Sequence, residues 1–339
     1  MGLQIKDIIT KKEVDLSSFK NKVLVVDAFN VIYQFLSSIR QMDGTPLQDS
    51  QARITSHLSG LFYRNIALLS EGVKLIYVFD GEAPDLKLVT HEKRSEAKAI
   101  AKEKYESAKD SEDIEGMRRY SQQLTGLDAK KIEESKKLLL AMGIPVIQAP
   151  GEGEAQASYM CKQGDAYAVA SQDYDCLMFN APKLVQNLTL AKKRKTVGGW
   201  SDVVPNEIEL SKVLEELEIN QDQLICIGIL SGTDYNPSGV KGIGQKKALK
   251  FVQEHKTPEE IFQAVEDSEK YELDFDWKPV FEAIKNPKIV KDYKIEFGKF
   301  DESAVKELLM EYEFSEDRIE KQFEKIHALK ERAKQQTLF

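Results

Sequence analysis

Short runs of β-branched and aromatic residues alternate with helical patterns over the first two thirds of the chain, and this alternation strongly limits the possible folds. We interpret five runs as strands: Lys22–Asp27 (KVLVVD), Val73–Asp80 (VKLIYVFD), Pro145–Gln148, Ala166–Ser171 (AYAVAS) and Leu184–Asn187. Because strands separated by helices pair in parallel and are covered on both faces, the sequence predicts an α/β fold with a mainly parallel, twisted sheet flanked by helices.

Composition excludes several classes of protein. Of the 339 residues, 42% are hydrophobic and 31% are charged, which excludes global disorder. No window holds the ~18 consecutive apolar residues of a membrane span, and the first residues lack the apolar run of a secretory signal. We therefore expect an intracellular protein without a membrane partner. The three cysteines lie far apart, so neither a disulfide framework nor a thiolate zinc site is indicated.

The charge balance argues against a general polyanion binder, because the formal net charge is −8. Cations are nevertheless concentrated locally. The segments Lys183–Lys195 and Val240–Lys250 contain several lysines and no carboxylate. Such patches can hold phosphates while the whole molecule stays acidic.

Acidic residues follow the predicted strands and the small-residue motifs near them. Seven such acids border apolar segments: Asp27, Asp80, Glu152, Glu154, Asp173, Asp175 and Asp234. Because the carboxyl ends of parallel strands meet at one edge of a sheet, these acids could converge. Helix caps and turns explain one or two of them, but seven converging carboxylates would repel one another unless divalent cations neutralise them. Oxygen ligands favour Mg²⁺ or Mn²⁺ over zinc.

This pattern indicates a site of the nuclease or polymerase type. Two divalent ions about 3.5 to 4 Å apart can activate a water and stabilise the leaving oxygen in phosphodiester hydrolysis. The sequence contains no Gly-x-x-x-x-Gly-Lys-Ser/Thr loop, and no nucleophilic Ser or Cys with a histidine partner is evident.

Five motifs in a fixed order carry a family resemblance: DAFN, VFDG, APGEGEA, SQDYD and GTDY, followed by VKGIGQKKA. This set resembles the flap endonuclease branch of the XPG structure-specific 5′ nuclease family over nearly the whole chain, and the short tail resembles its archaeal members. The resemblance implies a PIN/5′ nuclease-like fold. It also implies a Mg²⁺-dependent endonuclease that cuts branched DNA at the 5′ flap junction by two-metal-ion hydrolysis, with 5′-3′ exonuclease activity, in Okazaki fragment maturation and DNA repair.

The resemblance also assigns the acids to two metal ions. It places Asp27, Asp80, Glu152 and Glu154 at the first Mg²⁺ ion, some of them acting through water. It places Asp173, Asp175 and Asp234 at the second Mg²⁺ ion. Mn²⁺ is expected to substitute for Mg²⁺ at both.

A stretch rich in both charge signs runs from about Pro84 to Lys131, and by itself it predicts a solvated helical insertion. Four cations are spaced so that they lie on roughly one helix face, which is an alternative indication of phosphate contact: Lys87, Arg94, Lys98 and Lys102. The resemblance makes Lys87 and Arg94 the catalytic cations at the scissile phosphate and makes the insertion a helical arch for the single-stranded flap.

Further DNA contacts follow from the resemblance. Tyr33 matches an aromatic residue that stacks on a base near the cut, although a core tyrosine is an equal alternative. Gly2 matches the processed amino terminus near the site. Arg53 and Arg64 bound a segment that resembles the one contributing to upstream-duplex and 3′-flap recognition.

A glycine turn precedes a lysine-rich helix start in VKGIGQKKA. Such turns are common, but this one also fits a backbone clamp for phosphates. The resemblance makes it a helix-hairpin-helix-type element that holds duplex DNA and a monovalent cation. Its residues are Gly242, Gly244, Lys246 and Lys247.

The tail begins a sliding-clamp box of the form Gln-x-x-hydrophobic-x-x-aromatic-aromatic with Gln335, Leu338 and Phe339. Because the box is incomplete, we expect either a shortened sequence or weakened binding to a PCNA-like clamp. The resemblance also implies a monomer, and for an archaeal member it implies a location in the cytoplasm or nucleoid.

Six segments are expected. They are an N-terminal nuclease half (1–84), the arch insertion (85–131), an internal nuclease half (132–225), the helix-hairpin-helix-type region (226–300), a C-terminal helical segment (301–334) and the clamp-binding tail (335–339). A 5′-3′ exonuclease or junction resolvase of the same superfamily is an alternative. A non-catalytic DNA or clamp adaptor is a further alternative from a different class.

Overall fold

A seven-stranded sheet with the order β1-β9-β6-β5-β2-β3-β4 forms the centre of the computed structural model. The structure describes residues 3–41, 44–82, 99–101, 103–104, 126–188, 193–196, 199–268 and 270–336. The sheet strands are β1 (Lys12–Glu13), β2 (Val23–Asp27), β3 (Lys74–Phe79), β4 (Val146–Gln148), β5 (Ala168–Ala170), β6 (Lys183–Gln186) and β9 (Asn206–Glu209). A separate hairpin pairs β7 (Lys193–Thr196) with β8 (Gly199–Asp202).

The pairing within the sheet confirms the predicted parallel core. Strands β6, β5, β2, β3 and β4 are parallel, and Val25 of β2 pairs with Ile76 of β3 and Val169 of β5. The sequence analysis missed β9 and β1, which add antiparallel strands at one edge. The two residues of β1 and the mixed polarity of β9 give little strand signal before pairing.

The strand order reverses between β2 and β5. The chain passes from β2 outward through β3 to β4 and then returns to place β5 on the other side of β2. In open α/β sheets, ligands bind beyond the carboxyl ends of the strands at such a reversal. The topology therefore marks the crevice between β2 and β5.

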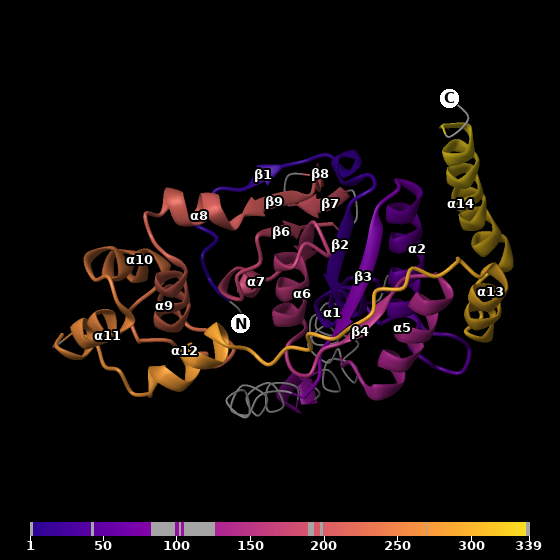
Figure 1. Ribbon diagram of the computed structural model, residues 1–339. Coiled ribbons are helices and arrows are strands. Elements are labelled where there is room, and N and C mark those ends of the chain that lie inside the picture. Colours follow the sequence, from indigo (N-terminus) through magenta and orange to yellow (C-terminus); the bar gives the residue numbers. More distant parts are fainter. Residues whose placement is uncertain are drawn as a thin grey trace.

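Helices cover both faces of the sheet (Figure 1). The α-helices are α1 (Ala28–Ser38), α2 (Ser56–Ser70), α5 (Ala129–Ala141), α6 (Gly153–Lys162), α7 (Asp175–Met178), α8 (Leu210–Glu216), α9 (Gln221–Ser231), α10 (Gln245–Glu254), α11 (Pro258–Glu266), α12 (Trp277–Lys285), α13 (Glu302–Glu311) and α14 (Glu316–Gln336), and a 3₁₀ helix spans Leu16–Phe19. None of the helices described is both long and apolar enough to cross a lipid bilayer.

Alternate residues of β2 point into two different cores. Leu24 and Val26 pack with α1, α2, α5, α13 and α14, whereas Val25 packs with α6, α7 and α9. All three side chains are fully buried. This burial on both sides explains why the strand is continuously apolar rather than alternating with polar residues.

Helices α9 to α12 form a helical unit at one end of the molecule (Figure 1). Capping boxes at Asn220 and Thr257 precede α9 and α11, so nearby residues in the sequence fix where these two helices begin. Helix α9 lies between α7 of the nuclease part and α10, α11 and α12 of this unit. The segment boundary expected at 225/226 therefore falls inside α9, whose apolar residues Leu224–Leu230 are all buried.

An extended strap, residues 286–300, joins α12 to α13 (Figure 1). The buried Gln156 side chain donates a hydrogen bond to the Val290 carbonyl and accepts one from the Val290 N–H, each 2.8 Å long. Further along, the Gly298 N–H donates to the Gly143 carbonyl at 3.1 Å. These contacts fix the strap along α6 and the turn after α5.

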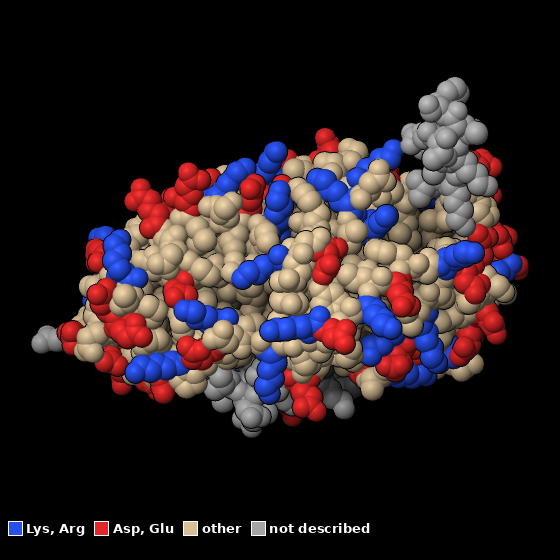
Figure 2. All heavy atoms as spheres, viewed as in Figure 1, with Lys and Arg blue, Asp and Glu red and all other residues tan. Residues whose placement is uncertain are grey.

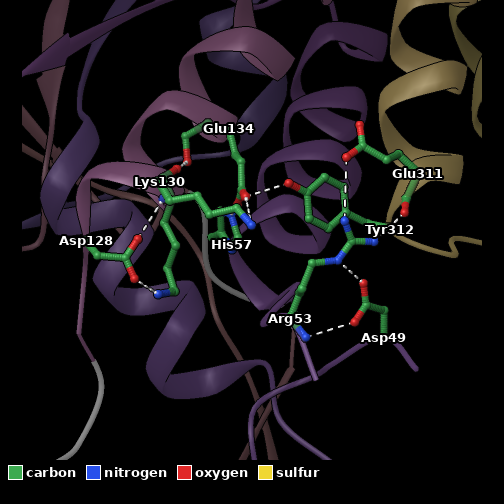
Figure 3. A network of polar contacts seen from close by, with 10 residues as sticks. Asp49, Arg53, His57, Asp128, Lys130, Glu134, Glu311 and Tyr312 are labelled. Carbon is green, nitrogen blue, oxygen red and sulfur yellow. Dashed lines mark hydrogen bonds and ion pairs between the residues drawn. The ribbon is translucent and has the colours of Figure 1, made fainter. Parts of the chain in front are cut away.

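The C-terminal segment is helical as expected and consists of two helices, α13 and α14. A buried polar network anchors this segment to the rest of the molecule (Figure 3). Glu134 of α5 lies 2.9 Å from His57 Nε2 and accepts a hydrogen bond from the Tyr312 hydroxyl. The Arg53 guanidinium lies 4.3 Å from the Tyr312 ring centroid. Burial opposes ionisation of Glu134, but the hydrogen bonds from His57 and Tyr312 outweigh it and hold the pKa of this carboxyl below its usual value.

We expect Tyr312→Phe to lower the free energy of unfolding by about 1 kcal/mol, because Glu134 loses one of its donors in a buried position. Urea unfolding followed by circular dichroism measures this. The matched control is Tyr271→Phe, in a tyrosine that packs on Phe251 at the far end of the molecule. Equal midpoints for the two variants would contradict the anchoring role of the Tyr312 hydroxyl.

Candidate active site

Four neighbouring strands direct acids to the same edge of the sheet. Asp27 is the last residue of β2, and Asp80 follows β3. Glu152 and Glu154 lie at the start of α6 after β4, and Asp173 lies in the loop between β5 and α7. Because β5, β2, β3 and β4 are adjacent and parallel, these segments converge.

The acids lie close enough for their charges to act on one another. The charges of Asp80 and Asp173 act on Asp27, and the charges of Asp175, Asp27, Asp173 and Glu152 act on Glu154. The structure thus brings together the acids from four separate motifs.

Asp27 is both an acid of this cluster and a helix cap. Its side chain is 5% exposed, and its Oδ1 accepts a hydrogen bond from the Asn30 N–H at 3.2 Å at the start of α1. An aspartate at this position is locally favoured because it satisfies an unpaired helix N–H group. The same geometry fixes the carboxylate at the end of β2.

Asp80 is held by the backbone at the start of α6. Its Oδ1 accepts a hydrogen bond from the Gly153 N–H at 2.8 Å. A Cβ atom at position 153 would lie 2.5 Å from the same oxygen, so a side chain there would displace the carboxylate. This explains the glycine between the two glutamates of APGEGEA.

Glu154 is partly buried and contacts polar groups from two neighbouring segments. Its Oε1 accepts a hydrogen bond from Ser171 Oγ at 3.1 Å and lies 3.5 Å from the Cys176 Sγ. Burial, followed by the charges of neighbouring acids, raises the pKa of Glu154 well above its usual value. Burial and the charges of Asp80 and Asp173 raise the pKa of Asp27 in the same way.

The amino-terminal segment reaches the cluster. The Leu3 N–H donates a hydrogen bond to Asp175, which is 6% exposed at the start of α7. The predicted role of Gly2 falls on a residue outside those described, but its neighbour Leu3 contacts one of the acids. Leu3 is therefore adjacent to Asp175, one of the second predicted group of acids.

Asp234 lies in the turn after α9, and the next residue connects this turn to the cluster. The buried Tyr235 hydroxyl is hydrogen-bonded to Glu152. Burial, followed by the charge of Glu152, raises the pKa of Tyr235. The sequence analysis missed Tyr235, although its position beside the acid of GTDY was the available signal.

The predicted DNA contacts outside the cluster have different environments. Tyr33 is 40% exposed on α1, which excludes the alternative of a core tyrosine. Arg53 contacts Asp49, Glu311 and the Tyr312 ring rather than the acid cluster (Figure 3). Arg64, on α2, is partly buried, and burial lowers its pKa. Their roles in DNA binding stay predictions.

The glycine turn before α10 is exposed. Gly242 has a φ of 86°, which a residue with a side chain adopts at a cost, and a Cβ atom at position 244 would meet no other atom within 4 Å. Lys246 and Lys247 are both exposed, and Lys247 Nζ donates a hydrogen bond to the Gly242 carbonyl at 2.8 Å. This geometry fits a backbone clamp of the predicted kind.

Some predicted residues lie outside the part of the chain that the structure describes. These are Gly2, Lys87, Arg94, Leu338 and Phe339. Gln335 falls in the last turn of α14, so the expected boundary between segments at 334/335 lies inside this helix.

The oxygen donors of the acid cluster are the kind of ligand that a hard divalent cation prefers. These donors are carboxylate oxygens with raised pKa values at Asp27 and Glu154, and a cation would relieve their repulsion. Within the described ranges, no three His, Cys, Asp or Glu side chains already form a compact ligand group. Metal binding at these residues is therefore a proposal.

Comparison with known proteins places the chain in a family. The XPG N-terminal domain matches residues 1–101, and the XPG I-region matches residues 143–234. Flap endonuclease 1 of Hyperthermus butylicus is 46% identical over 96% of this chain and 94% of its own length. Flap endonuclease 1 of Pyrococcus furiosus is 47% identical over 100% of this chain and 98% of its own. The chain belongs to the XPG nuclease family, in its flap endonuclease branch.

Solved structures agree with this assignment. Flap endonuclease-1 from Methanococcus jannaschii has a TM-score of 0.75 and 40% identity, covering 97% of this chain and 98% of that chain. The catalytic core of Rad2 in complex with a DNA substrate has a TM-score of 0.71 at 22% identity, covering 94% of this chain and 96% of that chain, and this likeness concerns the fold alone.

We expect Asp27→Asn to stabilise the protein in chelator by about 1 kcal/mol, because asparagine keeps the helix cap and removes a repelling charge. Since burial raises the pKa of Asp27, the folded state binds more protons than the unfolded state above the usual carboxyl pKa. Stability in chelator should therefore fall as the pH rises through this range, and less steeply in the variant. Thermal unfolding at several pH values measures both effects.

The matched control is Asp301→Asn, which changes an aspartate that also caps a helix, since its Oδ1 accepts a hydrogen bond from the Ala304 N–H at 3.0 Å. Asp301 lies at the start of α13, apart from the acid cluster. An equal gain in both variants would contradict repulsion as the cause.

Proposed function

We propose that this protein is a Mg²⁺-dependent, structure-specific 5′ flap endonuclease that acts inside the cell on branched DNA during replication and repair. The observation that carries the proposal is the convergence of acids from four motifs at the reversal point of the sheet. The membership of the chain in the flap endonuclease branch supports the same substrate.

The acid cluster would hold two divalent cations, with Asp27, Asp80, Glu152 and Glu154 nearest one and Asp173, Asp175 and Asp234 nearest the other. When bound, such ions supply a Lewis acid that activates water and stabilises the leaving oxygen. Mn²⁺ would substitute for Mg²⁺ because both prefer oxygen ligands. The protein itself contributes the fixed positions of the carboxylates.

Duplex DNA would bind through local phosphate contacts. Figure 2 shows Lys, Arg, Asp and Glu side chains mixed over the face in view, so a broad basic surface is not present on the described part of this face. The turn at Gly242 and Gly244, with Lys246 and Lys247, would instead hold the phosphate backbone and a monovalent cation. Because such contacts read no bases, specificity would follow the shape of the DNA.

The remaining assignments complete the proposal. Lys87 and Arg94 would contact the scissile phosphate from an arch around the flap, and the exposed Tyr33 would stack on a base beside the cut. Arg53 and Arg64 would belong to the surface near the upstream duplex. A monomer would bind a sliding clamp through Gln335, Leu338 and Phe339.

We expect Asp173→Ala to abolish flap cleavage, because it removes a proposed ligand of the second cation. DNA binding should be largely kept, because Asp173 is exposed and caps no helix, so its loss should not disturb the fold. End-labelled double-flap, nicked, blunt and single-stranded DNA, each with Mg²⁺ and with chelator, measure cleavage, and anisotropy measures binding. Asp292→Ala, which removes an exposed acid on the strap, is the control.

Retained cleavage by Asp173→Ala would defeat the site assignment. Trimming of blunt ends by the wild-type protein in preference to flaps would favour a 5′-3′ exonuclease. Tight flap binding without any cleavage would favour an adaptor.

We expect Lys246→Ala to weaken binding to double-flap DNA and to reduce the slope of log Kd against log salt by about 1, as for the loss of one phosphate contact. Anisotropy titrations at several salt concentrations measure the slope. Lys212→Ala removes an exposed lysine on α8 that pairs with Glu209 at 3.2 Å and serves as the control. An unchanged slope in Lys246→Ala would remove this lysine from the clamp.

A further inference from the structure

We propose that two side-chain amides, Asn30 and Gln186, are positioning residues that hold the loop carrying Asp173 against the end of β2. This inference deepens the proposed function and rests on it, because it concerns how the chain arranges the acids of the metal site. Neither amide has a role in the function described so far.

Asn30 connects the two sides of the crevice. Its backbone N–H donates to Asp27 Oδ1 at 3.2 Å, and its side-chain Nδ2 donates to Asp173 Oδ2 at 2.6 Å. Its Oδ1 accepts a hydrogen bond from the Gln172 N–H at 3.2 Å. One residue of α1 thus contacts an acid at the end of β2 and an acid in the loop after β5.

Gln186 holds the same loop from the opposite side. It is the last residue of β6 and is 4% exposed. Its Nε2 donates to the Gln172 carbonyl at 2.7 Å, and its Oε1 accepts a hydrogen bond from Lys11 Nζ at 2.8 Å. The same Lys11 Nζ lies 4.9 Å from the centroid of the Tyr174 ring.

These contacts fix both backbone polar groups of Gln172. Its N–H is bound by the Asn30 amide and its carbonyl by the Gln186 amide. The position of Asp173, the next residue, therefore follows from α1 and β6 rather than from the short strand β5. Because Gln172 is held through the peptide groups on both of its sides, losing either bond should loosen the loop and losing both should release it.

The loop needs such restraint because its own charges oppose it. The charge of Asp173 acts on Asp27, which is buried, and on Glu154, which is partly buried. An amide donor can contact a carboxylate without adding charge, and it keeps its proton at any ordinary pH. Asn30 thereby holds two mutually repelling carboxylates at one spacing before any cation binds.

The first test is hydrogen exchange in chelator, which does not depend on metal binding. We expect Asn30→Ala and Gln186→Met to increase exchange at residues 171–175 at least about tenfold. Asn65→Ala is the matched control, since it removes a buried amide on α2 that accepts a hydrogen bond from the Tyr77 hydroxyl at 2.8 Å. Exchange at residues 171–175 should be unchanged in this control.

The second test is titration with MnCl₂ alone, followed by electron paramagnetic resonance of free Mn²⁺. We expect Asn30→Ala and Gln186→Met to raise the dissociation constant about tenfold, and Asn65→Ala to leave it unchanged. Gln186→Glu keeps the acceptor for Lys11 but loses the donor to Gln172, so it should behave like Gln186→Met.

The outcomes separate this inference from the proposed function. Wild-type exchange at residues 171–175 in both amide variants would overturn the positioning role. So would wild-type Mn²⁺ affinity in these variants while Asp173→Ala binds Mn²⁺ weakly, and the proposed metal site would then stand. Unchanged Mn²⁺ affinity in Asp173→Ala would instead overturn the proposed metal site, and faster exchange in the amide variants would still support their hold on the loop.

Discussion

Repulsion between carboxylates at the carboxyl edge of the sheet is the constraint on which the rest of this structure depends. Burial and neighbouring charges raise the pKa values of Asp27 and Glu154. The fold must therefore hold these carboxylates together against their mutual repulsion. Backbone N–H groups of Asn30, Gly153 and Leu3 supply part of that hold. The cluster therefore exists at some expense of stability, as is usual for sites that bind cations or substrates.

The elements around the cluster also connect it to the rest of the molecule. Helix α6 begins at the acids, and the side chain of Gln156 on the same helix fixes the strap at Val290. The strap leads from the α9–α12 unit to the C-terminal helices, which the His57, Glu134 and Tyr312 network anchors. The proposed duplex-binding turn and the nuclease core thus share one framework, which suits recognition of DNA shape over an extended surface.

The sequence analysis was accurate where local pattern and final structure agree. The continuously apolar run around Val25 predicted a buried parallel strand. The acids after the strands lie at one edge of the sheet because strand ends fix where such residues lie, and their role as a metal site stays a prediction. The sequence analysis missed β9, whose strand signal is weak before it pairs with β6. It also placed a segment boundary at 225/226, inside α9, because the continuous apolar run Leu224–Leu230 gives no sign of which part of the molecule it packs against.

The sequence by itself determined the five parallel strands and their order along the chain, the acids that follow them and the family to which these motifs belong. Only the tertiary structure decided which residues hold the acids in place. Asn30, Gln186 and Tyr235 are ordinary polar residues in the sequence, and their roles depend on contacts between segments as far apart as Asn30 and Asp173. Such contacts are formed by the packing of strands and helices, and local propensity carries no information about them.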